Sequence, residues 1–342
     1  MTEFLLSLAA GPSLSLATRP LFGLPLADLW FVVVMALLGA FLFLDGFDFG
    51  IGALFATRSD EHDRETLLAA IGPFWDGNEV WLVVFGGSLF AVFPRAYASL
   101  FGRYYLLMFA ILAALVVRGL APEMYEQRDD DAWTAAWGVA FVAGSVGAPF
   151  FLGVFAGNWV VGAPGLVSVA GLLFGVALVA LSIVEGAAFL GLKTRGALRE
   201  ELTRYGTRAA VAYLVLAVVA VGYLATRSAD LRGGVRSVPG LLAVALTAAA
   251  TVGYVLATRR KRYHVAFVAA AGAAFALVAL VGTLLYPYVD PATGLTVRAA
   301  AVAPLSLNLV SVAAALLVPL VLVYFGVLYS VFAGQIEAGE GY

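Results

Sequence analysis

Long uninterrupted runs of apolar residues dominate the chain, and they limit its fold more than any other feature. Of its 342 residues, 63% are hydrophobic and only 12% are charged, which is far from the composition of a soluble globular domain. A helix needs about 20 apolar residues to cross a bilayer. Nine stretches satisfy this, at residues 27–56, 68–93, 99–121, 133–160, 165–191, 207–226, 238–257, 264–286 and 304–333. The sequence therefore predicts an all-α membrane bundle of nine transmembrane helices.

The parts of the chain outside this bundle are short. Residues 1–26 are expected to form an N-terminal extension, because the acidic Glu3 stands where a secretory signal would have a basic region. Residues 27–336 form the predicted transmembrane domain, and residues 337–342 a C-terminal tail.

The distribution of Lys and Arg predicts the orientation. Thirteen of the 20 basic residues fall at or near the ends of spans one, three, five and seven or in the loops that follow, and seven fall on the opposite side. Because basic residues are enriched in cytoplasmic loops, the N-terminus is expected outside and the C-terminus in the cytoplasm.

Two carboxylates interrupt the first apolar run. Asp45 and Asp48 share one helix face by their spacing, and Asp45 lies 17 residues after Asp28, about 26 Å along a helix. Both are thus expected near the cytoplasmic face, at a depth comparable to Arg118 and Glu185. Charged groups at such depth usually pair or line a wet path. The sequence leaves two interpretations open: an ion pair with Arg118, or a proton relay of coupled acids.

A second polar motif, GPFWDGNEVWL, covers residues 72–82 at the expected cytoplasmic entry of span two. The simpler interpretation makes Asp76 a helix N-cap with Glu79 as its capping-box partner, and Trp75 and Trp81 part of an interfacial aromatic belt. The functional interpretation is a proton-loading site that includes Asp76 and Glu79 beside Asn78. The two interpretations are compatible.

A short internal echo predicts a duplicated architecture. Asp45-Gly46 with Phe49 matches Glu185-Gly186 with Phe189 at a constant offset of 140 residues. Two four-helix pseudo-repeats plus one extra helix would produce this pattern, as in many transport bundles.

The composition removes several kinds of chemistry. With no cysteine there is no thiolate metal site or disulfide, and the two histidines, His62 and His264, fall in or beside predicted cytoplasmic loops. Met35 and Met108 lie inside apolar runs, where packing is the more common role. No metal site is therefore expected in this chain, and any haem would be held by another chain. The net charge of −2 gives no reason to expect nucleic acid. The basic run at 259–262 is typical of a topology signal, with contact to anionic lipid as a second role.

The two polar motifs resemble the signature segments of subunit II of the cytochrome bd-type quinol oxidases, the partner of the haem-bearing subunit I. The first is DGFDFGIG at residues 45–52, and the second is GPFWDGNEVW at 72–81, followed by GGSLFAVFP at 86–94. The resemblance covers essentially the whole chain, although the second half matches mainly in hydropathy and spacing.

The resemblance implies nine helices in a multi-pass protein of the prokaryotic plasma membrane. It implies quinol oxidation coupled to reduction of oxygen to water, with two b-type haems and one d-type haem ligated by subunit I, and no catalytic residue in this chain. It leaves room for a structural quinone and for a small single-helix subunit. By position, Asp76, Asp45 and Asp48 match acids near the proton route, and Trp81 matches a proposed oxygen entry. Trp75 and Asn78 would lie at that entry or at the subunit interface.

This sequence departs from the family pattern at Glu185, where relatives carry an uncharged side chain or His, and in a short loop after span four. Two other functions fit the residues: a stand-alone proton- or cation-coupled transporter, suggested by acids in glycine-interrupted helices, and a purely structural scaffold.

Overall fold

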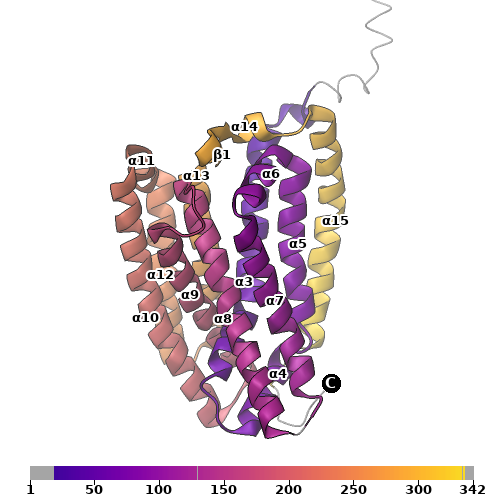
Figure 1. Cartoon of the computed structure of the whole chain (residues 1–342), viewed down its shortest axis with the longest axis vertical. Coiled ribbons are helices and arrows are strands. Elements are labelled where there is room, and N and C mark those ends of the chain that lie inside the picture. Colours follow the sequence, from indigo (N-terminus) through magenta and orange to yellow (C-terminus); the bar gives the residue numbers. More distant parts are fainter. Residues whose placement is uncertain (1–18, 129, 333, 336–342) are drawn as a thin grey trace, which may run out of the picture.

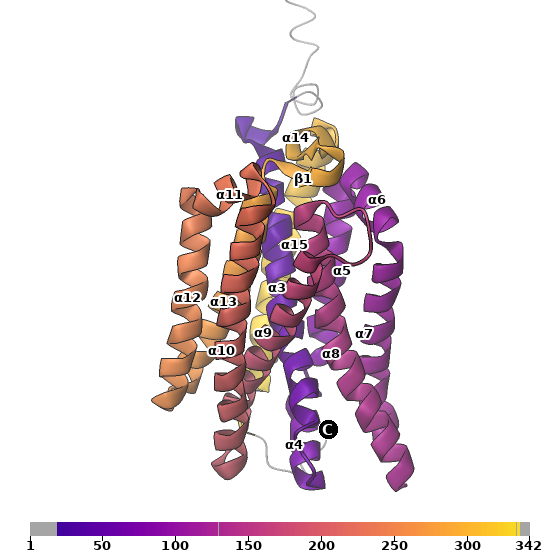
Figure 2. The ribbon, with the colours of Figure 1, turned by 60° about the vertical axis from the view of Figure 1, so that its left-hand side comes forward.

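The computed structural model describes residues 19–128, 130–332 and 334–335 as a bundle of helices that run along one long axis (Figure 1). One end of the bundle carries α4 (Glu61–Ile71), and the opposite end carries α6 (Pro94–Arg103), α11 (Ala229–Arg236) and α14 (Val297–Ala300) (Figure 2). Most of the predicted N-terminal extension and the whole C-terminal tail lie outside the described residues.

Eight helices in the described part of the chain are long and apolar enough to cross a membrane. They are α3 (Leu26–Phe55), α7 (Tyr105–Tyr125), α8 (Asp131–Val161), α9 (Val169–Lys193), α10 (Gly196–Arg227), α12 (Val238–Arg259), α13 (Tyr263–Leu285) and α15 (Pro304–Val331). Most begin and end within a few residues of the predicted spans. The exception is α10, which starts 11 residues before the predicted 207, because its first turns are helical but polar.

Two predicted spans are each divided between two helices. The segment 68–93 covers the end of α4 and all of α5 (Trp75–Val92), with a turn at Gly72-Pro73 between them, since proline has no N–H and restricts the residue before it. The 18 residues of α5 are not among the eight apolar helices, because its first turn is polar. The segment 99–121 begins in α6 and continues in α7 after Tyr104, whose backbone is not helical.

The end that carries α6 is closed by a short antiparallel pair of strands and by small helical turns. The strands are β1 (Tyr288–Asp290) and β2 (Leu295–Thr296), and the turns are η1 (Leu21–Gly23) and η2 (Pro291–Thr293). Asp290 is fully buried and accepts hydrogen bonds from Arg103 and Ser99 of α6 and from Thr293. Burial disfavours its charge, but these bonds outweigh burial and hold the pKa of Asp290 below its usual value. The buried carboxylate thus ties the strand pair to α6.

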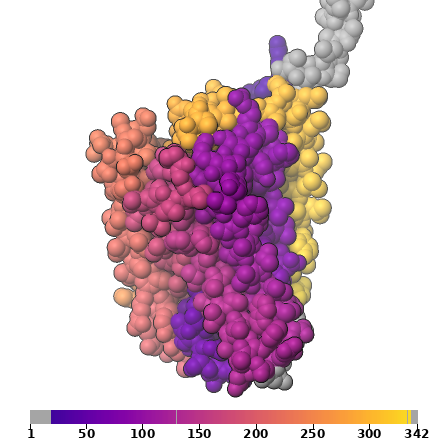
Figure 3. All heavy atoms as spheres, in the orientation of Figure 1, coloured from indigo at the N-terminus to yellow at the C-terminus, as the bar shows by residue number. Residues whose placement is uncertain are grey.

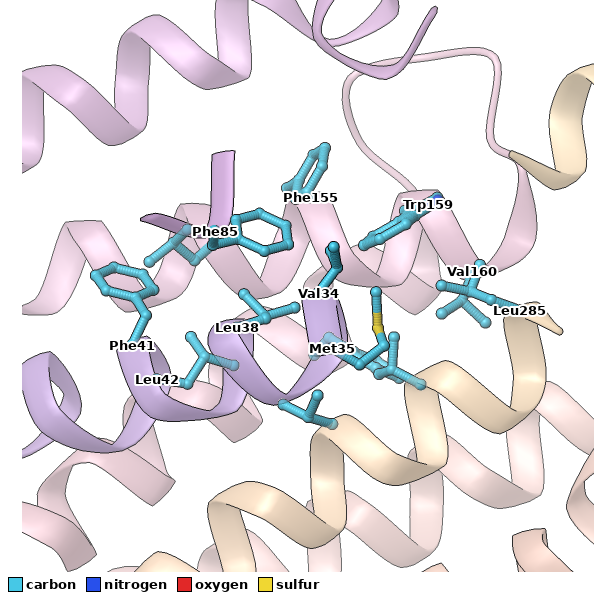
Figure 4. Close-up of a cluster of buried hydrophobic side chains, with 14 of the residues drawn as sticks. Val34, Met35, Leu38, Phe41, Leu42, Phe85, Phe155, Trp159, Val160 and Leu285 are labelled. Carbon is cyan, nitrogen blue, oxygen red and sulfur yellow. The ribbon is translucent and has the colours of Figure 1, made fainter. Parts of the chain in front are cut away.

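The 30-residue helix α3 forms the centre of the bundle. It is apolar on all sides and packs against α5, α8, α9 and α13. Figure 4 shows part of this core, in which Leu38 of α3 lies near Phe85 of α5 and near Phe155 and Trp159 of α8. Because α3 is surrounded, the acids it carries are held inside protein.

The closest approach in this core is the crossing of α3 and α9 at two glycines. A Cβ atom added at Gly50 would lie 1.8 Å from the carbonyl oxygen of Ser182, and one added at Gly186 would lie 2.5 Å from the carbonyl carbon of Gly50. Each glycine makes room for the other backbone. The two segments of the internal echo therefore lie against each other, while the four-plus-four repeat itself stays a prediction.

The last helix, α15, runs along one edge of the molecule (Figure 3). Of its residues, only Leu307 and Asn308 are buried. Polar contacts hold its first turns, where Asn308 bonds to the backbone of Arg19 and Leu21, and Ser311 accepts a hydrogen bond from Trp30. It is the least enclosed of the eight apolar helices.

Candidate functional site

Three carboxylates converge on one guanidinium inside the bundle. Asp45 and Asp48 of α3 are fully buried, and Arg118 of α7 is 2% exposed. Nη2 of Arg118 lies 2.8 Å from Oδ1 of Asp45, and Nη1 lies 3.9 Å from Oδ2 of Asp48. Nη2 also donates a hydrogen bond of 3.1 Å to Oε2 of Glu79, at the start of α5. The ion pair with Arg118 that the sequence left open is present, and Glu79 is its third acid.

An amide and a phenol extend the cluster to the edge of the molecule. Asn78 is buried, and its Nδ2 donates a hydrogen bond of 3.0 Å to Oδ2 of Asp48. Its Oδ1 accepts a hydrogen bond of 2.8 Å from the hydroxyl of Tyr329 on α15. Asp48 is thus connected through two hydrogen bonds to the outermost helix.

The backbone of Arg118 is closely packed, and aromatic rings cover its guanidinium. Pro122, one turn later, provides no N–H for the carbonyl of Arg118. Gly144 of α8 packs against the same point, where an added Cβ would lie 2.6 Å from the Arg118 nitrogen. The guanidinium carbon lies 5.0 Å from the ring centre of Phe49 and 6.0 Å from that of Trp75, so aromatic faces cover the cation.

The charges of the cluster do not balance when every group is ionised. One guanidinium faces three carboxylates, which leaves two negative charges uncompensated at a largely buried position. Buried charge without a partner costs several kcal/mol, so the arrangement favours retention of a proton among the acids. Glu79 is the one acid with substantial access, its side chain being 31% exposed. Glu79 therefore connects the buried acids of the cluster to the accessible surface.

Asp76 does not act as the expected N-cap. The structure begins α5 at Trp75 with Phe74 in the capping position, and no side chain caps the helix there. The turn at Gly72-Pro73 starts the helix early and places Asp76 inside its first turn, where it is exposed. The predicted capping box is therefore wrong, while Asp76 stays one turn from Glu79 on the same helix.

Glu185 occupies a separate place from the Arg118 cluster. It is fully buried on α9, and its Oε2 lies against Gly46 of α3, at 2.1 Å from where a Cβ would stand. Neither carboxylate oxygen has a hydrogen-bond partner among the described residues. Gly46, which Glu185 contacts, follows Asp45 in α3, and the described ion pairs of Arg118 do not include Glu185.

The two tryptophans of the second motif lie in different surroundings. Trp75 packs against α7 beside Gly119 and Arg118. Trp81 is buried, with its ring centre 5.5 Å from that of Phe325 on α15, and its Nε1 has no partner in the described part of the chain. Trp75 therefore belongs to the acid cluster, whereas Trp81 belongs to the contact between α5 and α15.

Comparison with known proteins adds to this geometry. Residues 26–332 match the family model described as cytochrome bd terminal oxidase subunit II. The chain belongs to this family. It is a subunit of a cytochrome bd terminal oxidase, an oxidoreductase complex, and with its eight apolar helices it is a multi-pass membrane protein.

Relatives from two bacteria support the assignment to the subunit II family. The chain is 33% identical over 319 residues to the cytochrome bd ubiquinol oxidase subunit 2 of Bacillus subtilis, covering 87% of this chain and 93% of the relative. It is 29% identical over 358 residues to the cytochrome bd-I ubiquinol oxidase subunit 2 of Escherichia coli K12, covering 90% and 94%. A chain of the bd oxidase from Geobacillus thermodenitrificans has the same fold, with a TM-score of 0.72 at 19% identity, covering 90% of this chain and 99% of that one.

The histidines and the buried methionine that the structure describes do not fit a haem. His62 and His264 are exposed at an end of the bundle, and the buried Met35 packs against Gly282 of α13. No three His, Cys, Asp or Glu side chains in the described ranges are grouped so as to hold a metal ion. Among the described residues, neither histidine nor Met35 is placed as a buried axial ligand for the haems that a cytochrome bd complex implies.

Sequence reasoning missed two members of the subunit II cluster, Phe49 and Tyr329. Phe49 lies next to Asp48 in the chain, but an aromatic residue in an apolar run carries no signal of its own. Tyr329 is 251 residues from Asn78, so no local spacing could connect them. Only the packing of α15 beside α5 shows the contact.

Proposed function

We propose that this chain is the haem-free subunit II of a bd-type quinol oxidase and that its acid cluster carries protons from the cytoplasm toward the partner subunit. The observation that carries the proposal is that one guanidinium joins the accessible Glu79 to the buried Asp45 and Asp48. A shared cation and an excess of carboxylates are what a site needs to hold a proton and release it.

The proposed route starts at the exposed Asp76. Glu79, three residues later on α5, is the next acid, and Arg118 links it to Asp45 and Asp48. The bond from Asn78 to Asp48 fixes the last carboxylate. Glu185 would serve as a separate proton-holding group across Gly46, on the side of α9.

Nine membrane crossings and an outside N-terminus complete the proposal. The connections support α5 as the ninth crossing, because it runs between α4 at one end of the bundle and α6 at the other (Figure 2). Its 18 residues extend about 27 Å, close to the hydrocarbon thickness of a bilayer. The excess of Lys and Arg at the α4 end supports placing that end in the cytoplasm of a prokaryotic cell.

The partner would supply the redox chemistry. We assign the two b-type haems and the d-type haem to subunit I, because the imidazoles here are exposed and few. Quinol and oxygen would be substrates of the assembled complex, and a small single-helix subunit would complete it. Trp81, in the apolar contact between α5 and α15, is the residue proposed to line oxygen access.

The proposal is tested by Asp45→Asn and Glu79→Gln in the assembled oxidase, reconstituted in vesicles. We expect quinol-dependent oxygen consumption and proton uptake to fall together, by about tenfold or more, because each change removes a protonatable group from the route. The visible haem spectrum checks that the complex is assembled. Glu61→Gln is the matched control, since Glu61 is an exposed acid at the same end of the bundle.

Two outcomes would contradict the proposal. Full turnover and proton uptake in Asp45→Asn, Asp48→Asn and Asp76→Asn, each with an intact haem spectrum, would leave the cluster a structural role. Isolation of the chain in mild detergent without a haem-bearing partner, together with ion-coupled uptake by the chain alone, would favour a transporter.

A further inference from the structure

A basic pocket opens at the α4 end of the bundle, away from the acid cluster. It lies where α9 turns into α10 and where α12 turns into α13, and its volume is about 330 Å³. Arg199, Lys261, Arg262 and His264 line it together with Tyr263, and no acidic residue in the described part of the chain is among its lining residues. The pocket therefore concentrates positive charge, and the acid closest to it is Glu200, which pairs with Lys261 from outside the lining.

Arg199 is the group in this pocket that most requires a ligand. Its guanidinium carbon lies 4.9 Å from the ring centre of Tyr263, which fixes the plane of the fork. Nε and Nη2 are buried, and neither has a hydrogen-bond partner within the described residues. Buried donors without acceptors are costly and rare. A planar fork with two adjacent unpartnered N–H groups matches the oxygens of a phosphate, and a rotation of the Arg199 side chain would turn these covered groups toward the pocket.

The turn after α12 holds a second cation, Lys261, in a strained backbone conformation. Lys261 has φ of +57°, in the left-handed region where glycine is the relaxed choice. Its ammonium lies 3.0 Å from Glu200, but both side chains are largely exposed, at 71% and 59%. Such a pair contributes little, so the lysine can exchange Glu200 for a ligand. The strained backbone at Lys261 therefore supports a use for its charge.

We propose that this pocket binds a phosphate group, held by the fork of Arg199 and the ammonium of Lys261. The group could belong to an anionic lipid headgroup or to free phosphate. In the orientation proposed above the pocket lies at the cytoplasmic headgroup level, where basic pockets between helices bind anionic lipid. The site does not depend on the proton route, because none of its residues contacts Asp45, Asp48, Glu79 or Arg118 in the described interactions.

The test uses the assembled oxidase, freed of lipid in detergent, in two arms. One arm titrates inorganic phosphate by calorimetry. The other exposes the complex to vesicles of phosphatidylglycerol or of phosphatidylcholine and counts retained lipid by native mass spectrometry. We expect Arg199→Gln and Lys261→Gly each to weaken anion binding by about tenfold or more, the effect of a lost charge-assisted hydrogen bond. The matched control, Arg259→Gln, removes an exposed cation of the same turn that does not line the pocket.

Lys261→Gly keeps the test decisive if Arg199→Gln fails to assemble, since glycine suits the left-handed backbone. Weakened retention of phosphatidylglycerol identifies a lipid headgroup, and weakened phosphate binding alone identifies the free anion. The proposal is overturned if neither anion binds or if both variants bind as the parent does. Oxidase turnover, measured in parallel, is expected to stay at the parent level in Lys261→Gly, which separates this site from the proton route.

Discussion

At the scale of single residues, Arg118 holds the centre of the molecule together because three acids share it. Asp45, Asp48 and Glu79 come from two different helices and would repel one another without the guanidinium. The aromatic faces of Phe49 and Trp75 exclude water from the cation and so strengthen its pairings. The cluster is thus both a structural joint and the proposed proton-holding site.

Arg118→Gln is predicted to destabilise the purified complex strongly. Removing one partner of a buried ion pair leaves uncompensated charge and costs about 3–5 kcal/mol. A thermal unfolding series in detergent measures the loss. Arg298→Gln is the control, because Arg298 is 76% exposed in its pair with Asp28 and should cost about 1 kcal/mol or less. Equal losses in the two variants would refute the role given to Arg118.

The sequence predicted the members of this site better than it predicted their arrangement. The two acids at helical spacing, Arg118 and the polar start of α5 all carried a signal, since charged groups are rare in apolar runs. The ion pair between Glu79 and Arg118 and the hydrogen bond from Tyr329 to Asn78 carried no signal in the sequence, because they depend on how distant helices pack. The sequence predicted Asp76 as the N-cap of α5, but the turn at Gly72-Pro73 places Phe74 in that position.

At the scale of elements, the crossing of α3 and α9 depends on glycine. Gly50→Ala is predicted to force the helices apart, because the new Cβ would lie 1.8 Å from a backbone oxygen that cannot rotate away. Overpacking of this kind costs about 1–3 kcal/mol or more. The yield of assembled complex and its unfolding temperature measure the effect.

Gly222→Ala provides the matched control for the crossing. Nothing lies within 4 Å of its added Cβ, so the substitution should be tolerated without loss. If Gly50→Ala assembled as well as Gly222→Ala, the close crossing would not be needed for the fold.

Helix boundaries were predictable wherever apolar residues predominated along a whole span. The span expected at 27–56 is α3 almost to the residue, because its apolar pattern continues on both sides of Asp45 and Asp48. The predicted spans 68–93 and 99–121 are each divided between two helices at Gly72-Pro73 and at Tyr104. Hydropathy does not reveal these backbone breaks. The relative placement of the helices was outside the reach of one sequence, because it depends on contacts between residues far apart in the chain.

At the scale of the whole molecule, the two ends differ in their electrostatics. The α4 end holds most of the basic residues, whereas the opposite end is tied by the buried Asp290 and its bonds to α6. Asp290→Asn is predicted to lower stability by about 1.5–3 kcal/mol at neutral pH, since it weakens hydrogen bonds to a charged group.

The difference in stability between the parent and Asp290→Asn should change with pH in a definite direction. A carboxyl group with a lowered folded-state pKa contributes its full stability above its ordinary pKa of about 3.9 and loses it as the pH falls through the folded value. The stability difference between the parent and Asp290→Asn should therefore stay constant from pH 7 to about 4 and narrow below that. Narrowing that begins between pH 7 and 5 would contradict the assignment.

The peripheral position of α15 determines how the molecule can be completed during synthesis. Chains emerge from the ribosome N-terminus first, so α3 to α13 can insert and pack before α15 is made. The ion pairs of Arg118 form entirely within that earlier part. Tyr329 arrives last, and its hydroxyl closes the chain of bonds through Asn78 to Asp48. A chain that ended before α15 would therefore keep the ion pairs of Arg118. It would lack the Tyr329 hydroxyl that donates to the buried amide oxygen of Asn78.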